Sequence, residues 1–471
     1  QEIDGVSIVT PITSKALRIE KPIGFEKLKS ILNIDIVERK GPIFIEIPLD
    51  VQASKFKDVK TSTKIKKQIL NIATKTQVNQ ISALLRKSKR PSMLIGGGVS
   101  RDVAYDLRKQ FSKLDIPIFT TWNGMDRISP LSKNYFGMPN TWGQRHANII
   151  IQQSDLLLAL GTRLGLQQTG FNWKEFIPIG NIIQVDIDKR ELKKGHPQVK
   201  WPYSFDVNNF LPRILRQNLG SNSEWIKFSK KVKKDFPLID KRNKTSNKYV
   251  SPYLLMQKLS YISRPKDVLV PCSSGGVFTA FKQAFTPKFG QKIVSNKGLA
   301  AMGYGLSAAI GASFANNNKR IIHLEGDGGF SQNLQEIGTM MINNLNIKTF
   351  IFDDSGYASI RMTQKNYFDG EYMGCDIESG LGFPNWEKLF FAWGLKSYKL
   401  KKDFDTDKTF LRYFNSIGPS VFVVPVDPNQ TYFPKIQSRV TRTGSMESNP
   451  LHKMYPDLTK EEEEVCLKFL K

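Results

Sequence analysis

Two short acidic segments could together hold a divalent cation and a diphosphate. The first is Gly326-Asp327-Gly328-Gly329 and the second is Asp353-Asp354-Ser355-Gly356-Tyr357, so that Asp354 lies 27 residues after Asp327. Mg²⁺ prefers oxygen ligands, which come from one or two carboxylates and from phosphate oxygens. Glycines let a diphosphate approach the backbone, and a helix N-terminus offers free N–H groups. The two segments therefore predict a magnesium and diphosphate site.

A strand, a helix and a second strand must bring these segments together. Residues 320–324 and 348–352 are short apolar runs typical of buried strands, and residues 331–344 have the pattern of a helix. Because such a crossover makes the two strands parallel, we expect Asp327 and Asp354 at one edge of an open sheet, where α/β proteins bind ligands. Gly-Asp-Gly alone is often only a turn. The second segment at a matching distance favours the site.

The two segments resemble the cofactor motif of the thiamine diphosphate (ThDP) enzymes, in the branch that contains acetolactate synthase and its decarboxylase relatives. That motif is Gly-Asp-Gly followed at a similar distance by Asn-Asn, where this chain has Asp353-Asp354. The second Asp keeps a liganding oxygen and adds a negative charge. The resemblance implies Mg²⁺ ligands at the Asp327 and Asp354 side chains and the Gly356 carbonyl. It also implies cofactor contacts from Gly326, Gly328, Gly329 and Tyr357.

Two further segments resemble parts of the same cofactor site. Residues 295–312 resemble the segment before the metal motif, in which Met302 would prop the bent cofactor and the Ala300 carbonyl would accept a hydrogen bond from its aminopyrimidine. A methionine by itself is more often a core residue. Residues 268–276 resemble the first loop that contacts the diphosphate. This implies cofactor contacts from Ser273, Ser274 and Gly275.

The resemblance implies an α/β fold of three doubly wound parallel-sheet domains, of which the first is incomplete. Apolar runs separated by helical patterns between residues 89 and 193 agree with such a sheet in the centre of the chain. We expect residues 1–60 to be the C-terminal part of a pyrimidine-binding domain, 61–220 a central domain, 221–247 a linker, 248–440 the diphosphate- and Mg-binding domain and 441–471 a C-terminal tail.

The family's activating glutamate belongs to the part of the pyrimidine-binding domain that would precede Gln1. We therefore name no catalytic residue in this chain. Three explanations are open: the chain is a fragment, another polypeptide completes the domain, or the chain is a degenerate paralogue. Gln1 in place of Met favours the fragment.

The central domain of acetolactate synthases holds FAD. The corresponding stretch here, Gly161–Gly170, keeps Arg163 and the closing Thr169-Gly170 but lacks the acidic and basic residues typical between them. Gly96-Gly97-Gly98 is not a full dinucleotide fingerprint. FAD and a central domain that binds nothing therefore remain alternative expectations.

Composition excludes several classes of protein. No run of 18 apolar residues occurs, and three scattered cysteines predict neither a disulfide framework nor a zinc site, which favours a reducing cytoplasm. The net charge of +26 could suit nucleic acid or anionic membranes. Lysines are spread along the chain, however, instead of forming one stripe with stacking aromatics. We expect no nucleic-acid or membrane partner.

Two functions follow from the resemblance. The first is a ThDP- and Mg-dependent enzyme that decarboxylates a 2-oxo acid, with pyruvate expected, and transfers the acyl unit to an acceptor carbonyl. The alternative is a noncatalytic ThDP-binding chain or partial subunit. Acetolactate synthases typically have a Trp where this chain has Thr363, so a specialised acceptor such as a keto sugar is expected. Arg361 could hold an acidic substrate or form a surface salt bridge. The family implies a homodimer or homotetramer, because two chains build each cofactor site.

Overall fold

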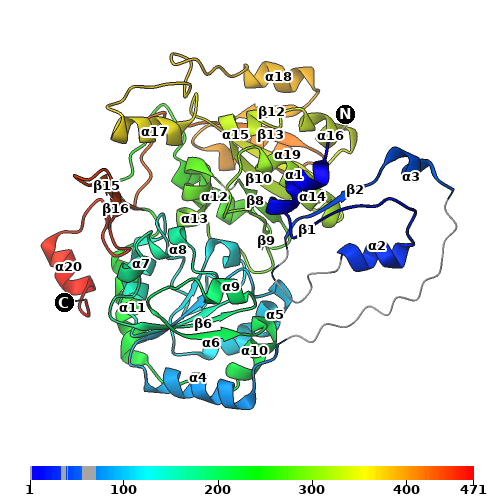
Figure 1. The fold of residues 1–471 in the computed structure, drawn as a ribbon. Coiled ribbons are helices and arrows are strands. Elements are labelled where there is room, and N and C mark those ends of the chain that lie inside the picture. The colour runs from blue at the N-terminus through cyan, green and yellow to red at the C-terminus, as the bar shows by residue number, and fades with distance from the viewer. Residues whose placement is uncertain (1–2, 33–38, 40, 56–70, 273, 471) are drawn as a thin grey trace.

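A computed structural model gives the fold of the chain and describes residues 3–32, 39, 41–55, 71–272 and 274–470 (Figure 1). Two large sheets and a small pair of strands are parallel throughout, which confirms the α/β class with several parallel-sheet units. The small N-terminal unit pairs β1 with β2, and several of its apolar side chains are exposed, including Ile8, Ile12 and Leu49. Its elements are α1 (Gly5–Val9), β1 (Lys15–Arg18), α2 (Phe25–Leu32), β2 (Ile43–Glu46) and α3 (Leu49–Ala53).

The central sheet has five parallel strands in the order β4-β3-β5-β6-β7. Every residue of β3 and β5 is buried, as expected of apolar strands covered on both faces. Four strands lie where the apolar runs predicted them. The sequence reading missed β7, which contains Lys200 and Pro202 and lies at the sheet edge, where proline is tolerated. The strands are β3 (Pro91–Ile95), β4 (Ile118–Thr120), β5 (Leu156–Leu160), β6 (Asn181–Asp186) and β7 (Val199–Ser204). The helices are α4 (Lys75–Lys87), α5 (Arg101–Asp106), α6 (Arg108–Lys113), α7 (Arg145–Gln152), α8 (Leu166–Thr169), α9 (Lys189–Leu192) and α10 (Val207–Ile214).

The third unit is a six-stranded parallel sheet in the order β12-β13-β11-β10-β8-β9. Its strands are β8 (Val268–Pro271), β9 (Lys292–Ile293), β10 (Ile321–Gly326), β11 (Ile347–Asp353), β12 (Lys396–Lys399) and β13 (Ser420–Pro425). Its helices are α12 (Pro252–Ile262), α13 (Gly275–Ala284), α14 (Tyr304–Ala315), α15 (Asp327–Ser331), α16 (Glu336–Ile342), α17 (Ala358–Tyr367), α18 (Trp386–Ala392) and α19 (Lys408–Asn415).

The crossover between β10 and β11 differs in one respect from the predicted one. The strands are adjacent and parallel as expected, with Gly326 paired to Phe352. The helix predicted over 331–344 is shorter in the structure, where α16 covers Glu336–Ile342, and a separate short helix, α15, precedes it at Asp327–Ser331. The Asn333 side chain donates to the Gly303 carbonyl at 2.7 Å, which ties the intervening turn to the segment before α14.

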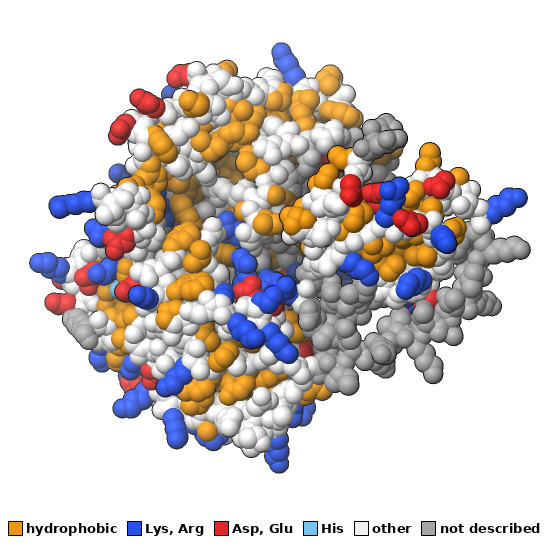
Figure 2. All heavy atoms as spheres, viewed as in Figure 1, with side chains coloured by type: hydrophobic (Ala, Val, Ile, Leu, Met, Phe, Trp, Pro, Cys, Tyr) orange, Lys and Arg blue, Asp and Glu red, His pale blue; other side chains and the backbone are white. Residues whose placement is uncertain are grey.

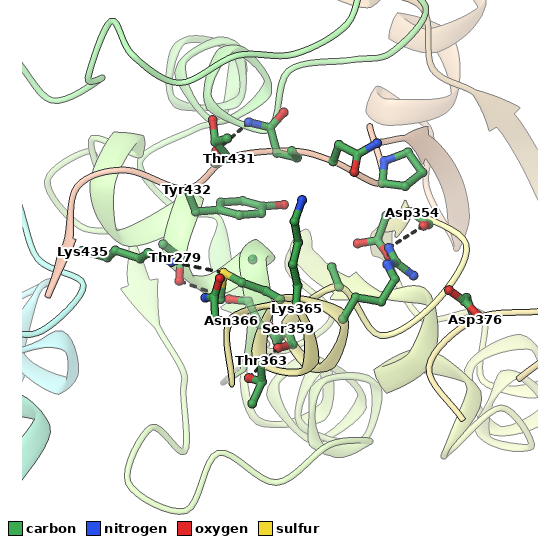
Figure 3. Close-up of a pocket in the computed structure, with 18 of the residues that line it drawn as sticks. Thr279, Asp354, Ser359, Thr363, Lys365, Asn366, Asp376, Thr431, Tyr432 and Lys435 are labelled. Atoms are coloured by element: carbon green, nitrogen blue, oxygen red, sulfur yellow. Dashed lines mark hydrogen bonds and ion pairs between the residues drawn. The ribbon is translucent and has the colours of Figure 1, made fainter. Parts of the chain in front are cut away.

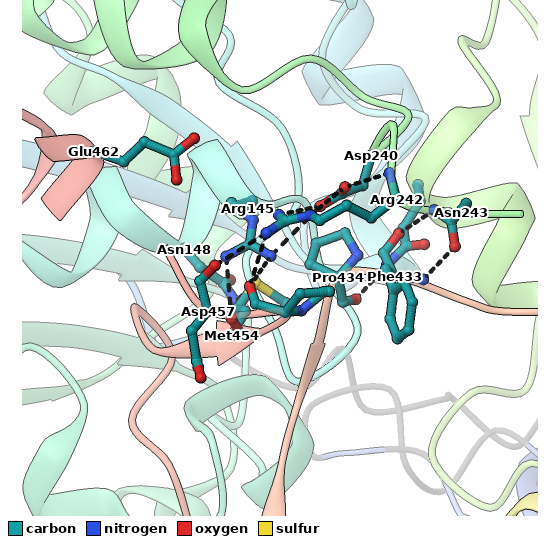
Figure 4. Close-up of polar contacts among 12 residues, drawn as sticks. Arg145, Asn148, Asp240, Arg242, Asn243, Phe433, Pro434, Met454, Asp457 and Glu462 are labelled. Carbon is teal, nitrogen blue, oxygen red and sulfur yellow. Dashed lines mark hydrogen bonds and ion pairs between the residues drawn. The ribbon is translucent and has the colours of Figure 1, made fainter. Parts of the chain in front are cut away.

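The ranges expected as a linker and a tail both contain helices that pack into a core. α11 (Ser223–Asp235) contributes Trp225 and Val232 to the apolar cluster that also holds Leu451 and Cys466. Figure 4 shows buried Arg145 and half-buried Arg242 converging on Asp240, and Arg145 also donates to the Met454 carbonyl at 3.1 Å. The C-terminal elements are β14 (Lys435–Ile436), β15 (Ser438–Val440), β16 (Met446–Ser448), β17 (Met454–Tyr455) and α20 (Lys460–Cys466), and the 3₁₀ turns of the chain are Thr10–Ile12, Trp122–Gly124, Trp173–Glu175 and Phe404–Thr406.

On the face that Figure 2 shows, charged side chains occur over several parts of the surface. Figure 2 shows Lys and Arg side chains scattered over the visible face, with acidic and apolar side chains between them. In the part of the chain that the structure describes, no helix combines the length and the apolar character needed to cross a membrane.

Candidate functional site

The two acidic segments meet at the carboxyl ends of β10 and β11. Asp327 follows β10 directly and is 1% exposed. Its Oδ2 accepts hydrogen bonds from the backbone N–H groups of Asp354 and Gly356, both at 3.2 Å, and its Oδ1 accepts one from the Gly328 N–H at 2.7 Å. The carboxylate therefore clamps the second segment onto the first.

Asp354 is held from its other side by Arg361 of α17. Arg361 Nη2 lies 3.0 Å from Asp354 Oδ1 and donates to the Asp354 carbonyl at 2.9 Å, while Nη1 donates to the Ser355 and Cys375 carbonyls. Arg361 is 8% exposed. The ion pair is buried, so the surface salt bridge expected for this residue was wrong, whereas a contact with an acidic substrate stays a prediction.

The electrostatics of this edge suit a cation. Burial, followed by the neighbouring Asp354 carboxylate, raises the pKa of Asp327, and burial also raises the pKa of Asp354 in spite of Arg361. A divalent cation between two such carboxylates would offset both effects. The described residues contain no cluster of three or more His, Cys, Asp or Glu that could hold a metal unaided. In a Mg²⁺ site at this edge, backbone and phosphate oxygens would have to complete the ligands.

At two positions of this sheet edge a side chain larger than that of glycine would clash with neighbouring atoms. Gly356 has a φ of +152°, and a Cβ atom there would collide with the Cys375 carbonyl. A Cβ atom on Gly328 would collide with the Tyr357 ring. The would-be Cβ of Gly326, by contrast, has no neighbouring atom within 4 Å, so space for a ligand exists beside the end of β10. Gly329 packs against the buried Glu325 side chain. The residues present thus fit a metal-bound diphosphate.

The remaining predicted contacts lie on neighbouring segments. Gly275 is the first residue of α13, with Ser274 directly before it, and its position faces open space next to Ser359. Ser273 lies outside the described residues. Ala300 adopts a φ of +56°, and the Met302 sulfur accepts a hydrogen bond at 3.7 Å from Gln332 in the turn after α15. Met302 is 37% exposed, so it is not a core residue.

A cavity of about 990 Å³ opens beside these residues (Figure 3). Asp354 lies at one side of it, Ser359 and Thr363 of α17 form another wall, and Thr431 and Tyr432 lie opposite. The sequence reading missed most of this lining because it comes from distant segments without a common motif. A usable signal was a charged residue inside the apolar run of α13. The missed residues include Trp142, Thr279, Lys282, Lys297, Lys365, Tyr432 and Lys435.

A second cavity of about 690 Å³ lies at the carboxyl edge of the central sheet. The loops after β3 and β5 meet there, since the Gly98 N–H donates to the Gly161 carbonyl at 2.9 Å. The strand order reverses between these two strands, which is where doubly wound sheets bind ligands. Arg163 and Gly165 of the Gly161–Gly170 stretch also line this cavity.

Comparison with known proteins finds two family models that match parts of this chain. Residues 78–214 match the family model of the thiamine pyrophosphate enzyme central domain, and residues 274–424 match that of the C-terminal TPP binding domain. The acetolactate synthase large subunit of Cyanidium caldarium is 28% identical over 455 residues, which cover 93% of this chain and 76% of that protein. A probable acetolactate synthase large subunit of Methanococcus aeolicus is 28% identical over 91% of this chain and 74% of its own length. The isozyme 2 large subunit of Escherichia coli (strain K12) is 25% identical, over 95% and 80% respectively.

Proposed function

Because this chain belongs to the thiamine diphosphate-dependent enzymes, as an acetolactate synthase-like carboligase and decarboxylase, we propose that it uses Mg²⁺-bound ThDP to decarboxylate a 2-oxo acid. Pyruvate is the donor we propose, and the acyl unit passes to the carbonyl of an acceptor. The observation that carries this proposal is the convergence of Asp327, Asp354 and Gly356 at the ends of two adjacent parallel strands.

In this proposal the chain's own residues anchor the cofactor and orient it. Asp327, Asp354 and the Gly356 carbonyl would hold Mg²⁺, and Ser274 and Gly275 would face the diphosphate. Met302 and the Ala300 carbonyl would position the aminopyrimidine. When bound, ThDP supplies the carbon nucleophile and the sink for the electrons that CO₂ loss leaves behind. The chain thus contributes binding and position, and we assign no catalytic acid or base among its residues.

The acceptor we propose is larger than pyruvate. Thr363 lines the cavity with its hydroxyl turned back to the Ser359 carbonyl at 3.0 Å, so its small side chain leaves space at this wall (Figure 3). A keto sugar would use that space. The acceptor series in the Discussion tests this part of the proposal.

FAD is the second cofactor we propose, in the cavity of the central sheet. Its support is the place of that cavity at the reversal of strand order, together with Arg163. The absorbance spectrum of the purified protein and mass spectrometry of the released cofactor test it. A colourless protein that gains no flavin on incubation with FAD would contradict it.

The enzymatic proposal is tested by CO₂ release. The chain as it stands, and a version extended upstream of Gln1, are supplied with ThDP, Mg²⁺ and a series of 2-oxo acids beginning with pyruvate. We expect the extended version to release CO₂ only when ThDP and Mg²⁺ are both present. The enzymatic proposal fails if neither version turns over any 2-oxo acid.

A partial subunit that needs another polypeptide is the second candidate. It is favoured by the exposed apolar side chains of the N-terminal unit, because a second protein surface could cover them. We expect assembly into a homodimer or homotetramer, and sedimentation of the chain with and without ThDP measures it. CO₂ release that appears only after a second chain is added would select this candidate. The exposed residues concerned are Ile3, Ile8, Ile12, Phe25 and Leu49.

A further inference from the structure

Lys282 is a buried lysine that lines the larger cavity. It lies in α13, where every residue from Val277 to Ala284 is buried, and it is itself 2% exposed. Its ammonium forms no ion pair with a carboxylate of the described residues. The ammonium lies 5.4 Å from the centroid of the Trp122 ring and 5.0 Å from that of Phe278.

A second lysine faces the same two rings. The Lys297 ammonium is 6.0 Å from the Trp122 centroid and 5.5 Å from the Phe278 centroid. Its backbone is fixed, because the Lys297 carbonyl accepts hydrogen bonds from the side chains of Trp122 and Asn123 at 3.2 and 3.1 Å. Lys297 lines both cavities. Two segments distant in the sequence therefore bring two cations to one place.

This arrangement is costly without a ligand. Burial lowers the pKa of Lys282 well below its ordinary value, with a further contribution from the Lys297 charge, and burial also lowers the pKa of Lys297. Aromatic faces replace only part of the hydration that a buried ammonium loses. An anion placed between the two ammonium groups would supply the missing charge and hydrogen-bond acceptors.

The other charges of the cavity do not supply that anion. Asp354 is paired with Arg361, and Asp376 accepts hydrogen bonds from Ser379. Glu378 lines the cavity as well, and Lys365 and Lys435 add two more positive charges. The lining is therefore positive overall, and the described residues leave Lys282 and Lys297 without an acidic partner.

We propose that Lys282 and Lys297 bind the anionic group, a phosphate or a carboxylate, of the acceptor substrate. The inference rests on the proposed function, because it depends on what that reaction does to the anionic group of the donor and of the acceptor. The carboxylate of the donor leaves as CO₂, and cations that bind it tightly would stabilise the starting state and oppose its loss. An anion of the acceptor is kept in the product, so tight binding carries no such penalty.

Titration calorimetry on the full chain saturated with ThDP and Mg²⁺ tests this site. The probes are inorganic phosphate and acetate, which distinguish a phosphate site from a carboxylate site. We expect Lys282→Met and Lys297→Met each to weaken binding of the preferred probe by about tenfold or more, and Lys282→Arg to retain it. Lys408→Met removes the same charge at an exposed position of α19, outside both cavities, and should leave the affinity unchanged.

A second measurement separates a binding role from a structural one. If the role of Lys282 is to bind a ligand, Lys282→Met removes an unpaired buried charge. The midpoint of thermal unfolding of the ligand-free protein should then rise. Unchanged affinity for both probes in Lys282→Met and Lys297→Met would overturn the inference. It would also be overturned if these variants made an oligomer of the protein dissociate but still bound the probes. The calorimetry needs no turnover, so probe binding can fail while CO₂ release persists, and the two proposals are judged separately.

Discussion

Arg361 and Asp354 form a buried ion pair, with Nη2 3.0 Å from Oδ1, directly beside the proposed metal position. The two side chains are 10% and 13% exposed. Of the two carboxylates that distinguish this chain's motif from Asn-Asn, the one of Asp354 is therefore paired within the chain. Because Arg361 balances the Asp354 carboxylate, the proposed site can hold Mg²⁺ and a diphosphate in spite of this additional negative charge.

The first prediction is that Arg361 and Asp354 act as one unit. Removing one partner leaves the other charge buried and unpaired, so Arg361→Met should lower the free energy of unfolding by about 3 kcal/mol. The double variant with Asp354→Asn should lose clearly less than the sum of the two single losses. Urea unfolding of the four proteins without cofactor measures the coupling. Additive losses would show that the pair is incidental.

The second prediction concerns the metal. Asp327→Ala removes a proposed Mg²⁺ ligand and the acceptor of the Asp354 and Gly356 N–H groups, so Mg²⁺-dependent binding of ThDP should be lost in titration calorimetry. Asp353→Asn is the matched control, because this carboxylate belongs to the same segment but is not a proposed ligand. We expect the control to bind ThDP as the parent does. Unchanged affinity in Asp327→Ala would refute the proposed cradle.

The third prediction concerns the backbone at Gly356. A methyl group there would meet the Cys375 carbonyl and would require a φ of +152° from a non-glycine residue. We expect Gly356→Ala to cost about 3 kcal/mol of stability in urea unfolding. Gly374→Ala is the control, because Gly374 also has a positive φ, of +59°, but no atom lies within 4 Å of its would-be Cβ. That control should cost about 1 kcal/mol. Equal costs would mean that the close contact contributes nothing.

The fourth prediction is a loss of stability in acid that originates at His146. This residue is buried, its Nδ1 lies 2.9 Å from the Phe236 carbonyl oxygen, and burial lowers its pKa from 6.5 to about 3. Between these values the unfolded chain binds a proton that the folded chain does not. Stability should therefore fall as the pH drops from 6.5 towards 3, by up to about 1.4 kcal/mol per pH unit from this group.

His146→Asn provides the comparison for that measurement. Asparagine can donate to the Phe236 carbonyl and does not titrate, so its stability profile should lack this contribution. His196 and His452, whose pKa values burial lowers to about 4, remain in both proteins, and the difference between the two profiles isolates His146. Parallel profiles from pH 6.5 to 3 would contradict the prediction.

The strands that carry the proposed metal site could be predicted because their signals are local. β10 and β11 are buried apolar runs that end in Gly-Asp and Asp-Asp, and right-handed crossover geometry then places Asp327 near Asp354. β7 escaped prediction because an edge strand tolerates Lys200 and Pro202. The break between α15 and α16 depends on Asn333 reaching the Gly303 carbonyl, a tertiary contact that helical periodicity does not contain.

The roles of the charged residues at the site could not be predicted from the sequence, because they too depend on tertiary contacts. Arg361 fits a surface ion pair or a substrate contact equally well until α17 is placed against the Asp354 loop. Lys282 and Lys297 are 15 residues apart on different elements, and the two rings that bring them together come from separate units of the chain. Residue type and spacing predicted that Asp327 and Asp354 come together, whereas the shape and charge of the neighbouring cavity follow from packing between distant segments.

The fifth prediction concerns the size of the acceptor. Thr363→Trp should fill part of the cavity wall and lower kcat/KM for large acceptors by about tenfold or more relative to pyruvate, because the bulky ring excludes them by steric overlap. Thr363→Ser, which keeps a small polar side chain, is the control and should leave the ratio near that of the parent. Steady-state kinetics with a graded series of keto acceptors, at fixed donor concentration in the version extended upstream, gives the ratio. If Thr363→Trp slows small and large acceptors equally, this wall does not select the acceptor by size.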